Sequence, residues 1–527
     1  MKNQIKKAIV CLACFYFFFG IEGAIAKTSV RELKINQFPT VEKGGRTLVY
    51  LSLDQVIRIA LQEASVIERI RITKEIAVSK LQAAKEKDHL TWNNNASINQ
   101  NAGLAETDFD NNSTSPYQSF TGVNTHTISS GLSKQDSNGI VYSMTLTKET
   151  ESKKSIIVKN RHDSANNIGK AGDATESTTL SVGIDVPLFQ DWGDFNDISI
   201  RQNEVLVNNE QFSAQQNRES LIEQVVAVYW TLAGQWKSRG TAEQAIALSE
   251  RLFRETKTKV ELGILKPIET PQAEIRLIKD QQALVEIDKK IAKIEDDLKI
   301  ILRQEGVLFG FLPSDKPIVK DVSINLSILQ EQAIASSPER SRLANSIKLN
   351  TYEYQAIEND LKPNIDLTAR YIFKGVGSGF SSSSDGMGDH HTNDYKIGLN
   401  WSVPIGGRQT QERLAQKSLE RELIEIRIRD LEAKTKSEIA NLVRELSLTK
   451  KKIQLSRKKV SLTKALLDEG IENLNLGNNM GYQVTQYQKD YVEAQEQLTI
   501  LLIELEKLHF SIELKAGIVS DNYLNRQ

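Results

Sequence analysis

Few side chains in this sequence have the types and spacing that a catalytic or metal site requires. His390 and His391 lie close to three aspartates, but adjacent histidines on a strand point to opposite sides and cannot both reach one ion. The aspartates are Asp385, Asp389 and Asp394. We interpret this stretch as an exposed Ser/Gly-rich loop, and we predict no metal, no cofactor and no enzymatic activity.

Two further motifs have bland explanations. "GVGSGF" (375–380) has glycines spaced as in some phosphate-binding loops, but no predicted helix follows it, as such a loop requires. "KKKIQLSRKKV" (450–460) is a basic run on a predicted helix. We interpret it as a solvated outer face, and contact with a partner protein is the alternative.

The most informative motifs interrupt long helical patterns with residues that end helices. "FRETKTKVELGILKPIETP" (253–271) contains Gly263, and "LDEGIENLNLGNNMGYQV" (467–484) contains Gly477. Glycine after the last helical residue adopts a left-handed conformation cheaply. Proline suits the first turn of a following helix. The two motifs therefore predict the turns of two helical hairpins.

The N-terminus has the pattern of a secretory signal peptide. Three lysines precede an apolar run from Ala8 to Gly20, and small residues before Lys27 offer a cleavage site. We expect residues 1–26 to be removed. Both cysteines, Cys11 and Cys14, lie in this segment, so the mature chain is expected to have no thiol and no disulfide.

Charge and composition favour long helices and give no reason to expect nucleic-acid binding. The formal net charge is −1, and removing Lys2, Lys6, Lys7 and Glu22 leaves about −3. Charged residues make up 26% and aromatic residues 6%, as in helices that bury only a narrow apolar stripe. No later stretch is apolar over the length of a membrane helix. Together with the signal peptide, this predicts an exported protein without a membrane-spanning helix.

The mature chain reads as one structural plan written twice. Each half opens with a helix, "LSLDQVIRIALQEA" and "INLSILQEQAIASS", which strands and two long helical segments follow. Ser52 with Gln55 forms a capping-box pattern, and Asn325 occupies the matching cap position. The expected divisions are a signal peptide (1–26), an N-terminal extension (27–50), a first repeat (51–306), a linker (307–323), a second repeat (324–517) and a tail (518–527).

Alternating polar and apolar residues predict strands at about 92–101, 179–188, 364–374 and 394–404. An amphipathic sheet covering a soluble core is one explanation. A membrane-facing sheet is favoured because aromatic residues lie on the apolar face and a long polar loop joins two strands. These aromatic residues are Tyr371, Phe373, Tyr395 and Trp401. The turn "DSNG" predicts an extra hairpin at 124–149, and the pattern leaves open whether it joins the same wall.

Apolar residues at strict seven-residue spacing predict supercoiled helices in both halves. The second half has Ile439, Leu446, Ile453, Val460, Leu467 and Leu474. The first half has Val225, Leu232, Ile246, Phe253 and Val260, interrupted by Arg239. An ordinary helical bundle is the alternative. A helix of about 45 residues is about 65–70 Å long, which suits crossing a compartment.

About four strands cannot close a membrane barrel, whose minimum is about eight. An open sheet edge in lipid leaves backbone groups without partners. If the strands span a membrane, several chains must share one barrel. The expected fold class is therefore an α+β membrane protein, with a shared β-barrel of about four strands per chain, a long antiparallel coiled-coil α-helical tunnel and two repeats.

This plan resembles the outer-membrane efflux proteins of the TolC type. The matching features are "LSLDQVIRIALQEA", "VGIDVPLF", "IGLNWSVPIGG", "VELGILKPIETPQAE" and "LNLGNNMGYQVTQYQKD". The resemblance implies a homotrimer with a shared twelve-stranded barrel in the outer membrane of a Gram-negative bacterium and a periplasmic helical tunnel. It further implies efflux of drugs or metals, or type I secretion of proteins, together with a periplasmic adaptor and an inner-membrane pump.

Under this resemblance the two hairpin turns are periplasmic tips that dock to the adaptor. The residues implied at the tip turns are Leu262, Gly263, Ile264, Leu476, Gly477 and Asn478. Glu269 matches an acidic position at the entrance. Gln483 and Gln486 stand where some family members have aspartates, so we expect a neutral gate and motion around 477–486. A soluble periplasmic coiled-coil scaffold or chaperone is the alternative function.

Overall fold

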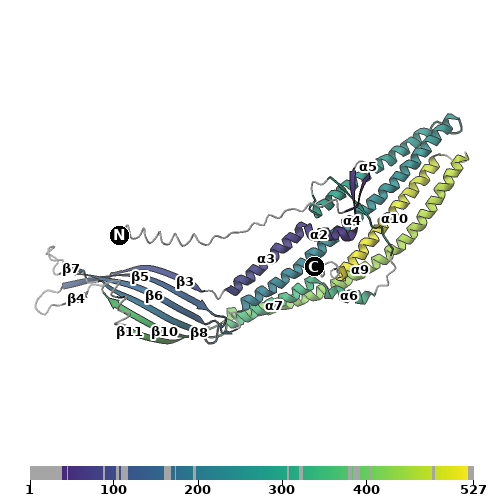
Figure 1. The fold of residues 1–527 in the computed structure, drawn as a ribbon. Helices are drawn as coiled ribbons and strands as arrows, with labels where there is room; N and C mark the ends of the chain where they lie inside the picture. Colours follow the sequence, from purple (N-terminus) through teal and green to yellow (C-terminus); the bar gives the residue numbers. More distant parts are fainter. Residues whose placement is uncertain are drawn as a thin grey trace. The chain divides into compact units, whose positions relative to one another are not determined.

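The computed structural model describes most of the chain and divides it into two compact units (Figure 1). The hairpin unit comprises the described parts of Met1–Ile67, Leu221–Val319 and Thr449–Lys507. The sheet unit comprises those of Glu68–Ser220, Lys320–Leu448 and Leu508–Gln527. The described residues are 38–43, 46–86, 90–102, 106–108, 117–158, 168–171, 174–193, 197–304, 308–319, 325–377, 383, 392–403, 405–476 and 481–519. Each unit draws on both halves of the sequence.

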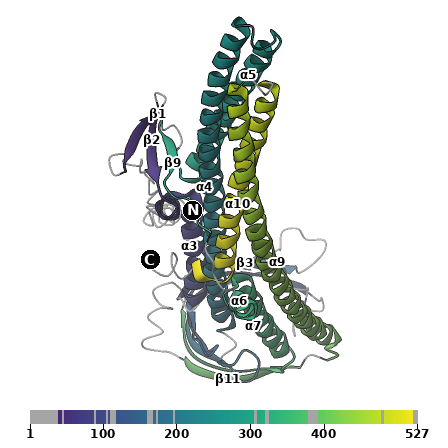
Figure 2. The ribbon, with the colours of Figure 1, turned by 90° about the vertical axis from the view of Figure 1, so that its right-hand side faces the viewer.

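Two helix pairs dominate the hairpin unit. The C-terminal part of α4 (Ile198–Glu261) lies beside α5 (Glu269–Ile301). The C-terminal part of α9 (Arg408–Asn475) lies beside α10 (Gly481–Lys515). Figure 2 shows the two pairs running along each other.

A small sheet and a capped helix complete this unit. The antiparallel strands β1 (Thr40–Lys43) and β2 (Arg46–Leu51) are joined by β9 (Gly310–Pro313), which is parallel to β2. In the chain, α2 (Leu53–Glu63) follows β2. The expected capping box is confirmed, because Ser52 Oγ accepts from the Gln55 backbone and Gln55 Oε1 accepts from the Ser52 backbone.

Buried polar groups fasten the small sheet to the long helices. The Tyr229 hydroxyl donates to Asp315 Oδ2 at 2.7 Å, and the Leu51 carbonyl oxygen lies 3.1 Å from the same hydroxyl. Burial, together with Asp315, raises the pKa of Tyr229. The Phe311 backbone N–H donates to Glu295 Oε1 at 3.2 Å. Burial raises the pKa of Glu295 despite this hydrogen bond.

The seven-residue pattern agrees with burial in α9 but not throughout α4. Ile439, Leu446, Ile453, Leu467 and Leu474 are buried, and Val460 is half-buried. In α4, Val225 and Leu232 are buried, but Ile246, Phe253 and Val260 are only half-buried. Beyond Arg239 the buried positions are one residue or more out of that register, at Thr241, Ala242, Ala245, Ser249, Leu252 and Thr256. This side of α4 contacts α9 and α10, since Leu252 packs with Leu467 and Val484 and the Ala245 carbonyl oxygen accepts from Gln488.

The helices of the sheet unit are joined by polar side chains. They are α3 (Ser65–Lys85), α6 (Leu326–Ala335), α7 (Pro338–Asn359) and the N-terminal parts of α4 and α9. The predicted cap of α6 is present, since Asn325 Oδ1 accepts from the backbone N–H groups of Ser327 and Ile328. Arg340 of α7 pairs with Glu432 of α9 at 2.7 Å. Among the described residues, no helix is long and apolar enough to span a bilayer.

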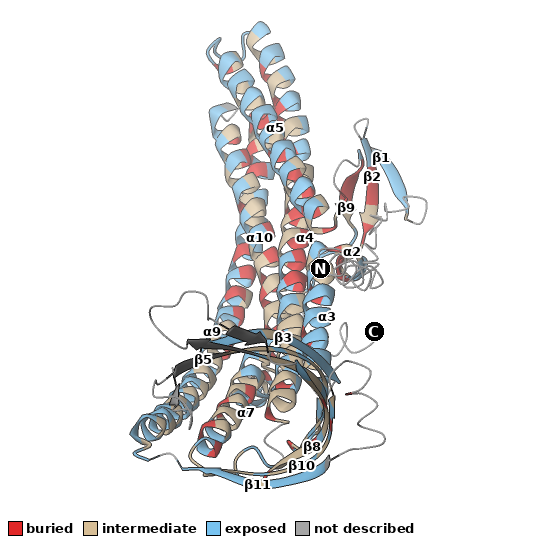
Figure 3. Ribbon diagram, turned by 90° about the vertical axis from the view of Figure 1, so that its left-hand side faces the viewer, coloured by how far each residue is buried: buried red, intermediate tan, exposed pale blue. Residues whose placement is uncertain are grey.

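One antiparallel sheet forms the rest of the sheet unit, and Figure 3 shows it as a curved band. Its strand order is β11-β10-β8-β6-β5-β3, while β4 pairs with β5 and β7 pairs with β6. The strands are β3 (Thr91–Ala102), β4 (Glu106–Asp108), β5 (Tyr117–Gln135), β6 (Val141–Val158), β7 (Ile168–Ala171), β8 (Thr175–Pro187), β10 (Asn364–Gly377) and β11 (Thr392–Ser402).

The expectation of about four wall strands per chain is wrong. The extra hairpin forms β5 and β6, which lie inside the sheet between β3 and β8 and raise the continuous path to six strands. Its turn forms as predicted, because Asp136 Oδ1 accepts from the backbone N–H groups of Asn138 and Ile140. Gly139 supplies a positive φ of 88°. The alternating pattern could identify this hairpin but could not choose its neighbours.

Candidate functional site

The first hairpin turn has a defined hydrogen-bond pattern at the end of α4. The Gly263 N–H donates to the Val260 carbonyl oxygen at 2.9 Å, and the Ile264 N–H donates to that of Lys259 at 2.8 Å. Gly263 has a φ of 74°. This arrangement is a Schellman motif, which satisfies the last carbonyl groups of a helix. The sequence motif therefore ends the helix as expected.

Apolar side chains project from this turn into solvent. Leu262 is 68% exposed, and Ile264 and Ile268 are also exposed. These three residues lie between α4 and α5, and Pro267 precedes the first turn of α5. Large apolar side chains exposed together at the end of a helical hairpin make this turn a candidate contact surface.

The second turn is described only in part. α9 ends at Asn475, and the Leu476 side chain that follows is 68% exposed. Gly477 and Asn478 lie outside the described residues. α10 begins at Gly481, and Tyr482 next to it is exposed. In both turns, the residue directly after the end of the helix is therefore a leucine, and the two leucines are equally exposed.

The residues expected at the entrance differ in their surroundings. Gln483 and Gln486 are exposed, and Gln486 Nε2 donates to Asp490 Oδ1 at 2.9 Å. Glu269 is only 9% exposed, and its Oε2 has no hydrogen-bond partner among the described residues. It lines a cavity of about 10 Å³ with Leu252, Thr256, Gln272, Ala273, Leu474 and Thr485. That volume is about one water molecule, so in the single chain this carboxylate faces the interior of the hairpin unit.

The two turns are tied together just below their ends. Lys259 Nζ donates to the Leu474 carbonyl oxygen at 2.7 Å, which joins the last turn of α4 to the last turn of α9. A lysine near a helix C-terminus also interacts favourably with the free carbonyl groups there. The ammonium group of Lys259 thus links the two tips, and the C-terminal ends of both helices stabilise its positive charge.

An apolar cluster packs beneath this link. Leu252, Leu467, Leu474 and Val484 are buried, and Tyr487 and Tyr491 pack against them. Gly470 has a packing role there, because a Cβ atom at this position would lie 2.7 Å from Tyr487 Cδ2. This glycine in α9 therefore admits the tyrosine ring of α10.

A buried polar network follows deeper in the hairpin unit. Gln488 Nε2 lies 2.7 Å from Ser249 Oγ, 3.0 Å from the Ala245 carbonyl oxygen and 3.3 Å from Asp280 Oδ2. Asp280 also accepts from Ser249 and pairs with Arg276 at 2.8 Å. Because Gln488 comes from α10, Ser249 from α4 and Asp280 from α5, the network fixes three helices in one register.

Sequence reasoning missed this network. Gln488 stands four residues after Val484 on the buried side of α10, and a polar residue in an apolar stripe is the available signal. Its amide oxygen has no hydrogen-bond partner among the described residues. The hydrogen-bonding capacity of this network is therefore not fully satisfied among the described residues.

The sheet unit exposes a second candidate surface. Strand register places Tyr371 opposite Tyr395 and Trp401 opposite Ile365 on one face. Tyr395 and Trp401 are 80% and 79% exposed, Tyr371 is exposed, and Phe373 is half-buried against the Tyr371 ring. Other large exposed apolar residues on this face are Trp92, Ile98, Ile128, Leu132, Tyr142, Met144, Leu146, Val182, Leu367, Ile397 and Leu399.

The opposite face of the same strands is polar. Arg370 pairs with Asp185 at 3.7 Å across neighbouring strands. Lys396 lies opposite Arg370, and Thr368 donates to the Gly398 carbonyl oxygen at 3.3 Å. The sheet therefore has one mainly apolar face and one mainly polar face. The exceptions include the Lys148–Glu176 ion pair on the apolar face and Ile372 on the polar face.

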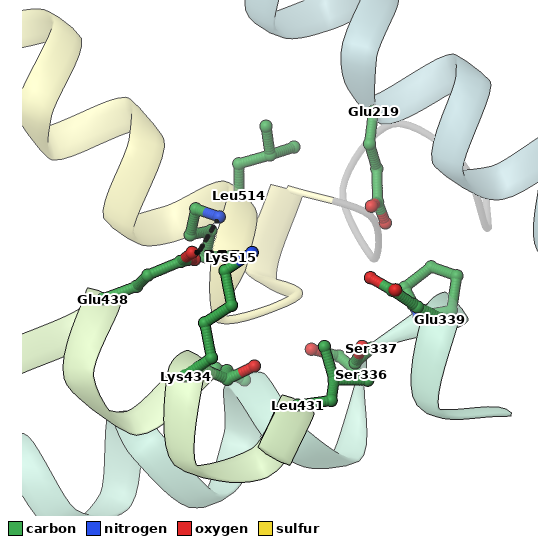
Figure 4. A pocket seen from close by; sticks show the side chains of 12 residues that line it. Glu219, Ser336, Ser337, Glu339, Leu431, Lys434, Glu438, Leu514 and Lys515 are labelled. Atoms are coloured by element: carbon green, nitrogen blue, oxygen red, sulfur yellow. Dashed lines mark hydrogen bonds and ion pairs between the residues drawn. The ribbon is translucent and has the colours of Figure 1, made fainter. Parts of the chain in front are cut away.

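A polar cavity of about 260 Å³ lies elsewhere in the sheet unit (Figure 4). Glu219 and Glu339 enter it from α4 and α7. Lys515 Nζ pairs with Glu438 at 3.0 Å, and Lys434 lies 4.0 Å from the same carboxylate. Its lysines are thus neutralised within the cavity, and we assign it no ligand.

Metal binding has no support among the described residues, which include no cluster of three His, Cys, Asp or Glu side chains suited to an ion. His390 and His391, which the sequence pointed to first, lie outside those residues. The candidate functional surfaces are therefore the exposed hairpin tips and the apolar sheet face.

No protein-family description and no curated protein sequence matches this chain. Solved structures do. The outer membrane protein VceC from Vibrio cholerae is 13% identical with a TM-score of 0.61, covering 88% of this chain and 96% of VceC. The CmeC outer membrane channel from Campylobacter jejuni is 12% identical with a TM-score of 0.60, covering 88% and 85%. The open-state MtrE outer membrane channel from Neisseria gonorrhoeae is 14% identical with a TM-score of 0.57, covering 88% and 89%.

These matches establish the fold. The chain has the α+β fold of solved outer-membrane channel proteins over 88% of its length. The resemblance that the repeated helix, strand and glycine-turn plan suggested agrees with them at the level of the fold. Several helices and strands from both halves of the chain are therefore arranged as in those channels.

Proposed function

We propose that this protein is an exit duct in the outer membrane of a Gram-negative bacterium. Three copies join their sheets into one barrel, and their helices continue into the periplasm. The duct serves efflux or type I secretion, and its hairpin tips dock to a periplasmic adaptor that works with an inner-membrane pump. The fold shared with solved outer-membrane channels supports this proposal.

One observation carries it: the sheet exposes its apolar face. Trp401, Tyr395 and Ile397 on β11 are each at least 71% exposed, while the other face is polar. In water this arrangement loses the benefit of burying apolar surface. In lipid it is the expected order, with apolar residues outward and polar residues toward a water-filled lumen.

The dimensions of the apolar band also fit a bilayer. On β10 the apolar face runs from Ile365 to Phe373, which is about 26 Å along a strand. A strand tilt of about 40° reduces this to about 20 Å, close to the roughly 25 Å band of outer-membrane barrels. A soluble periplasmic scaffold would leave this band unexplained.

The sheet edges support assembly from several copies. β11 and β3 end the strand order, so each has one side without a strand neighbour among the described residues. Unpaired backbone groups cannot remain in lipid. β3 runs antiparallel to β5, and strand directions alternate across the sheet to β11. The two edges are therefore antiparallel and can pair with each other in neighbouring copies.

The location is tested by separating membranes from a cell that produces the protein. We expect the protein in the detergent-extracted outer membrane, as a trimer that resists dissociation in mild detergent. We also expect channels in planar bilayers. Recovery in the soluble periplasm as a monomer would reject the duct and favour the scaffold.

Adaptor docking is tested at the two leucines of the tips. Leu262→Asp and Leu476→Asp place a charge on an exposed apolar contact, so we expect at least a tenfold loss of adaptor binding or export. Leu262→Met keeps the apolar surface and is the matched control. Each variant is first checked for trimers in the outer membrane. Normal export with both aspartates present would remove the tips from the docking surface.

The gate is tested by cation block. Gln483 and Gln486 are neutral, so we expect multivalent cations to block single channels weakly. Gln483→Asp together with Gln486→Asp should strengthen the block, because three copies would then place six carboxylates near one entrance. Strong micromolar block of the unchanged protein would contradict a neutral gate.

A further inference from the structure

The hairpin β5–β6 occupies an interior position in the sheet. β5 pairs with β3 on one side and β6 on the other, and β6 also pairs with β8. β3 and β8, which the sequence predicted as wall strands of the first half, are therefore not neighbours. The hairpin is an integral part of the sheet, because its strands carry the hydrogen-bonded connection between β3 and β8.

Both hairpin strands cross the full height of the apolar band. β5 pairs with β3 from Ser133, opposite Thr91, to Gly122, opposite Ala102. β6 pairs with β8 from Val141, opposite Asp185, to Glu151. The turn at 136–140 lies at the end of the sheet where β3 begins and β8 ends. Each strand is thus a complete crossing.

The hairpin also continues both faces of the sheet. Met144 lies beside Val182 and Leu132, and Leu146 lies beside Leu180. Met144, Leu146, Leu132 and Val182 are all exposed on the apolar face. The other face bears small and hydroxyl side chains, at Ser129, Gly131, Ser133, Ser143, Thr145 and Thr147. Each face therefore keeps its chemistry across the hairpin.

We infer that each copy contributes six strands, so that the trimeric barrel of the proposed duct has eighteen strands instead of twelve. This inference rests on the proposed function. With strands about 4.8 Å apart and tilted by about 40°, twelve strands give a backbone diameter of about 24 Å and eighteen give about 36 Å. Over residues 122–135 and 141–153, where side chains are described, the added lumen wall carries hydroxyl side chains, the charged residues Glu149, Glu151 and Lys153, and no aromatic side chain. Such a wall suits bulky, hydrated cargo such as a polypeptide.

The strands of the hairpin also extend beyond the band. β4 pairs with β5 at Tyr117–Ser119, and β7 pairs with β6 at Lys154–Ile157. β10 ends earlier, at Gly377 opposite Glu176. β4 and β7 thus prolong β3 and β8 alongside the hairpin, and the wall is taller on this side of each copy.

Cysteine accessibility in cells tests whether the hairpin spans the membrane. The natural cysteines lie only at 11 and 14, so single cysteines can be introduced at Met144, Thr145, Val182 and Ser181. In the native outer membrane, we expect a water-soluble maleimide to label Thr145→Cys and Ser181→Cys from the lumen. Labelling of Met144→Cys and Val182→Cys should be at least tenfold slower, because lipid covers them. Equal labelling at Met144 and Thr145, with the β8 pair still alternating, would place the hairpin outside the wall.

Electron microscopy of the intact trimer counts the strands directly. We expect eighteen strands and a barrel of about 36 Å backbone diameter. An outer-membrane trimer with twelve strands would overturn this inference and leave the proposed function intact. A protein absent from the outer membrane, or not trimeric, would overturn both.

Discussion

The hairpin unit and the sheet unit place the same kinds of residue on opposite sides. In the hairpin unit, Ile453 and Leu474 of α9 are buried, each with 1% of its surface exposed. On β11, Trp401, Leu399 and Ile397 face outward while charged residues occupy the other face. The difference shows that the hydrophobic pattern gives periodicity, while the surrounding solvent decides which face is inside.

The interiors differ as well. The hairpin unit tolerates a buried polar network around Gln488, with Asp280 and Arg276 paired. The polar face of the sheet instead carries Lys396, Arg370 and Asp185, which are accessible or partly accessible. The charged network of the hairpin unit is thus buried, while the Arg370–Asp185 pair of the sheet is partly accessible. The following substitutions test this contrast, from the largest expected effect to the smallest.

Ile453→Ala should have the largest effect, because it opens a cavity between α9 and its neighbours. We expect a loss of about 2–5 kcal/mol in the free energy of unfolding, measured by helical circular dichroism in denaturant. The exposed Lys452→Ala beside it is the control and should change stability by less than about 0.5 kcal/mol. Equal effects would mean that the stripe in α9 is not a buried core.

Leu399→Lys tests the outward apolar face of the sheet. In the proposed barrel, a lysine at mid-band in lipid costs about 2–4 kcal/mol. Trimers in the outer membrane should then be strongly reduced, as measured by gel mobility of unheated samples. Asn400→Lys lies one residue away on the opposite face and should assemble normally. If the two variants behaved alike, the sheet would not separate lipid from water.

Gln488→Ala removes the centre of the polar network and leaves the polar groups of Ser249 and Asp280 with fewer partners. We expect a cost of about 1–3 kcal/mol. Combining it with Ser249→Ala should give a coupling energy of at least about 0.5 kcal/mol in a double-mutant cycle. Strict additivity of the two changes would show that Gln488 and Ser249 act independently.

Gly263→Ala tests the first turn, since alanine at a φ of 74° is strained. We expect the left-handed turn to lose about 1–2 kcal/mol of stability. Hydrogen exchange should show this as faster amide exchange in the last turn of α4 and little change elsewhere. Gly240 in the middle of α4 has no heavy atom near a built Cβ, so Gly240→Ala is a matched control that should stabilise the helix. Slower exchange in Gly263→Ala would contradict the left-handed turn.

Glu295→Gln should have a small, pH-dependent effect. Because burial raises the pKa of Glu295 above its ordinary 4.5, its contribution to stability is full below about pH 4.5 and is lost as pH rises through the raised pKa. Glutamine keeps an oxygen for the Phe311 N–H but carries no charge. We expect a gain on the order of 1 kcal/mol at pH 7.5 and almost none at pH 4, by thermal unfolding. A loss at pH 7.5 would show that the carboxylate is stabilising.

Local signals in the sequence predicted local structure well. The capping box at Ser52, the Asp136 turn and the helix end at Gly263 depend on residues within a few positions of each other. The aromatic face of β10 and β11 followed from period-two alternation. In each case the determining interactions lie within a few residues of one another along the chain or repeat with a fixed period.

Long-range choices were not predictable in the same way. The insertion of β5–β6 between β3 and β8 depends on strand neighbours far apart in sequence. The burial of Leu252 in place of Phe253 depends on α10, and so does the Gln488 network. The interior orientation of Glu269 depends on Leu474 and Thr485. These features arise when separate segments pack, so a single sequence pattern does not contain them.

The interior position of the hairpin has an evolutionary consequence. β3 and β11 form the edges of the described sheet, and the hairpin lies between β3 and β8. Without the hairpin, β3 and β8 would have to pair directly, and their antiparallel directions allow this. In the proposed assembly, a lineage that gains or loses such a hairpin would change the perimeter of the barrel by two strands per copy, while the edge strands through which copies pair would stay the same. Pore width and subunit recognition can therefore diverge under separate selection.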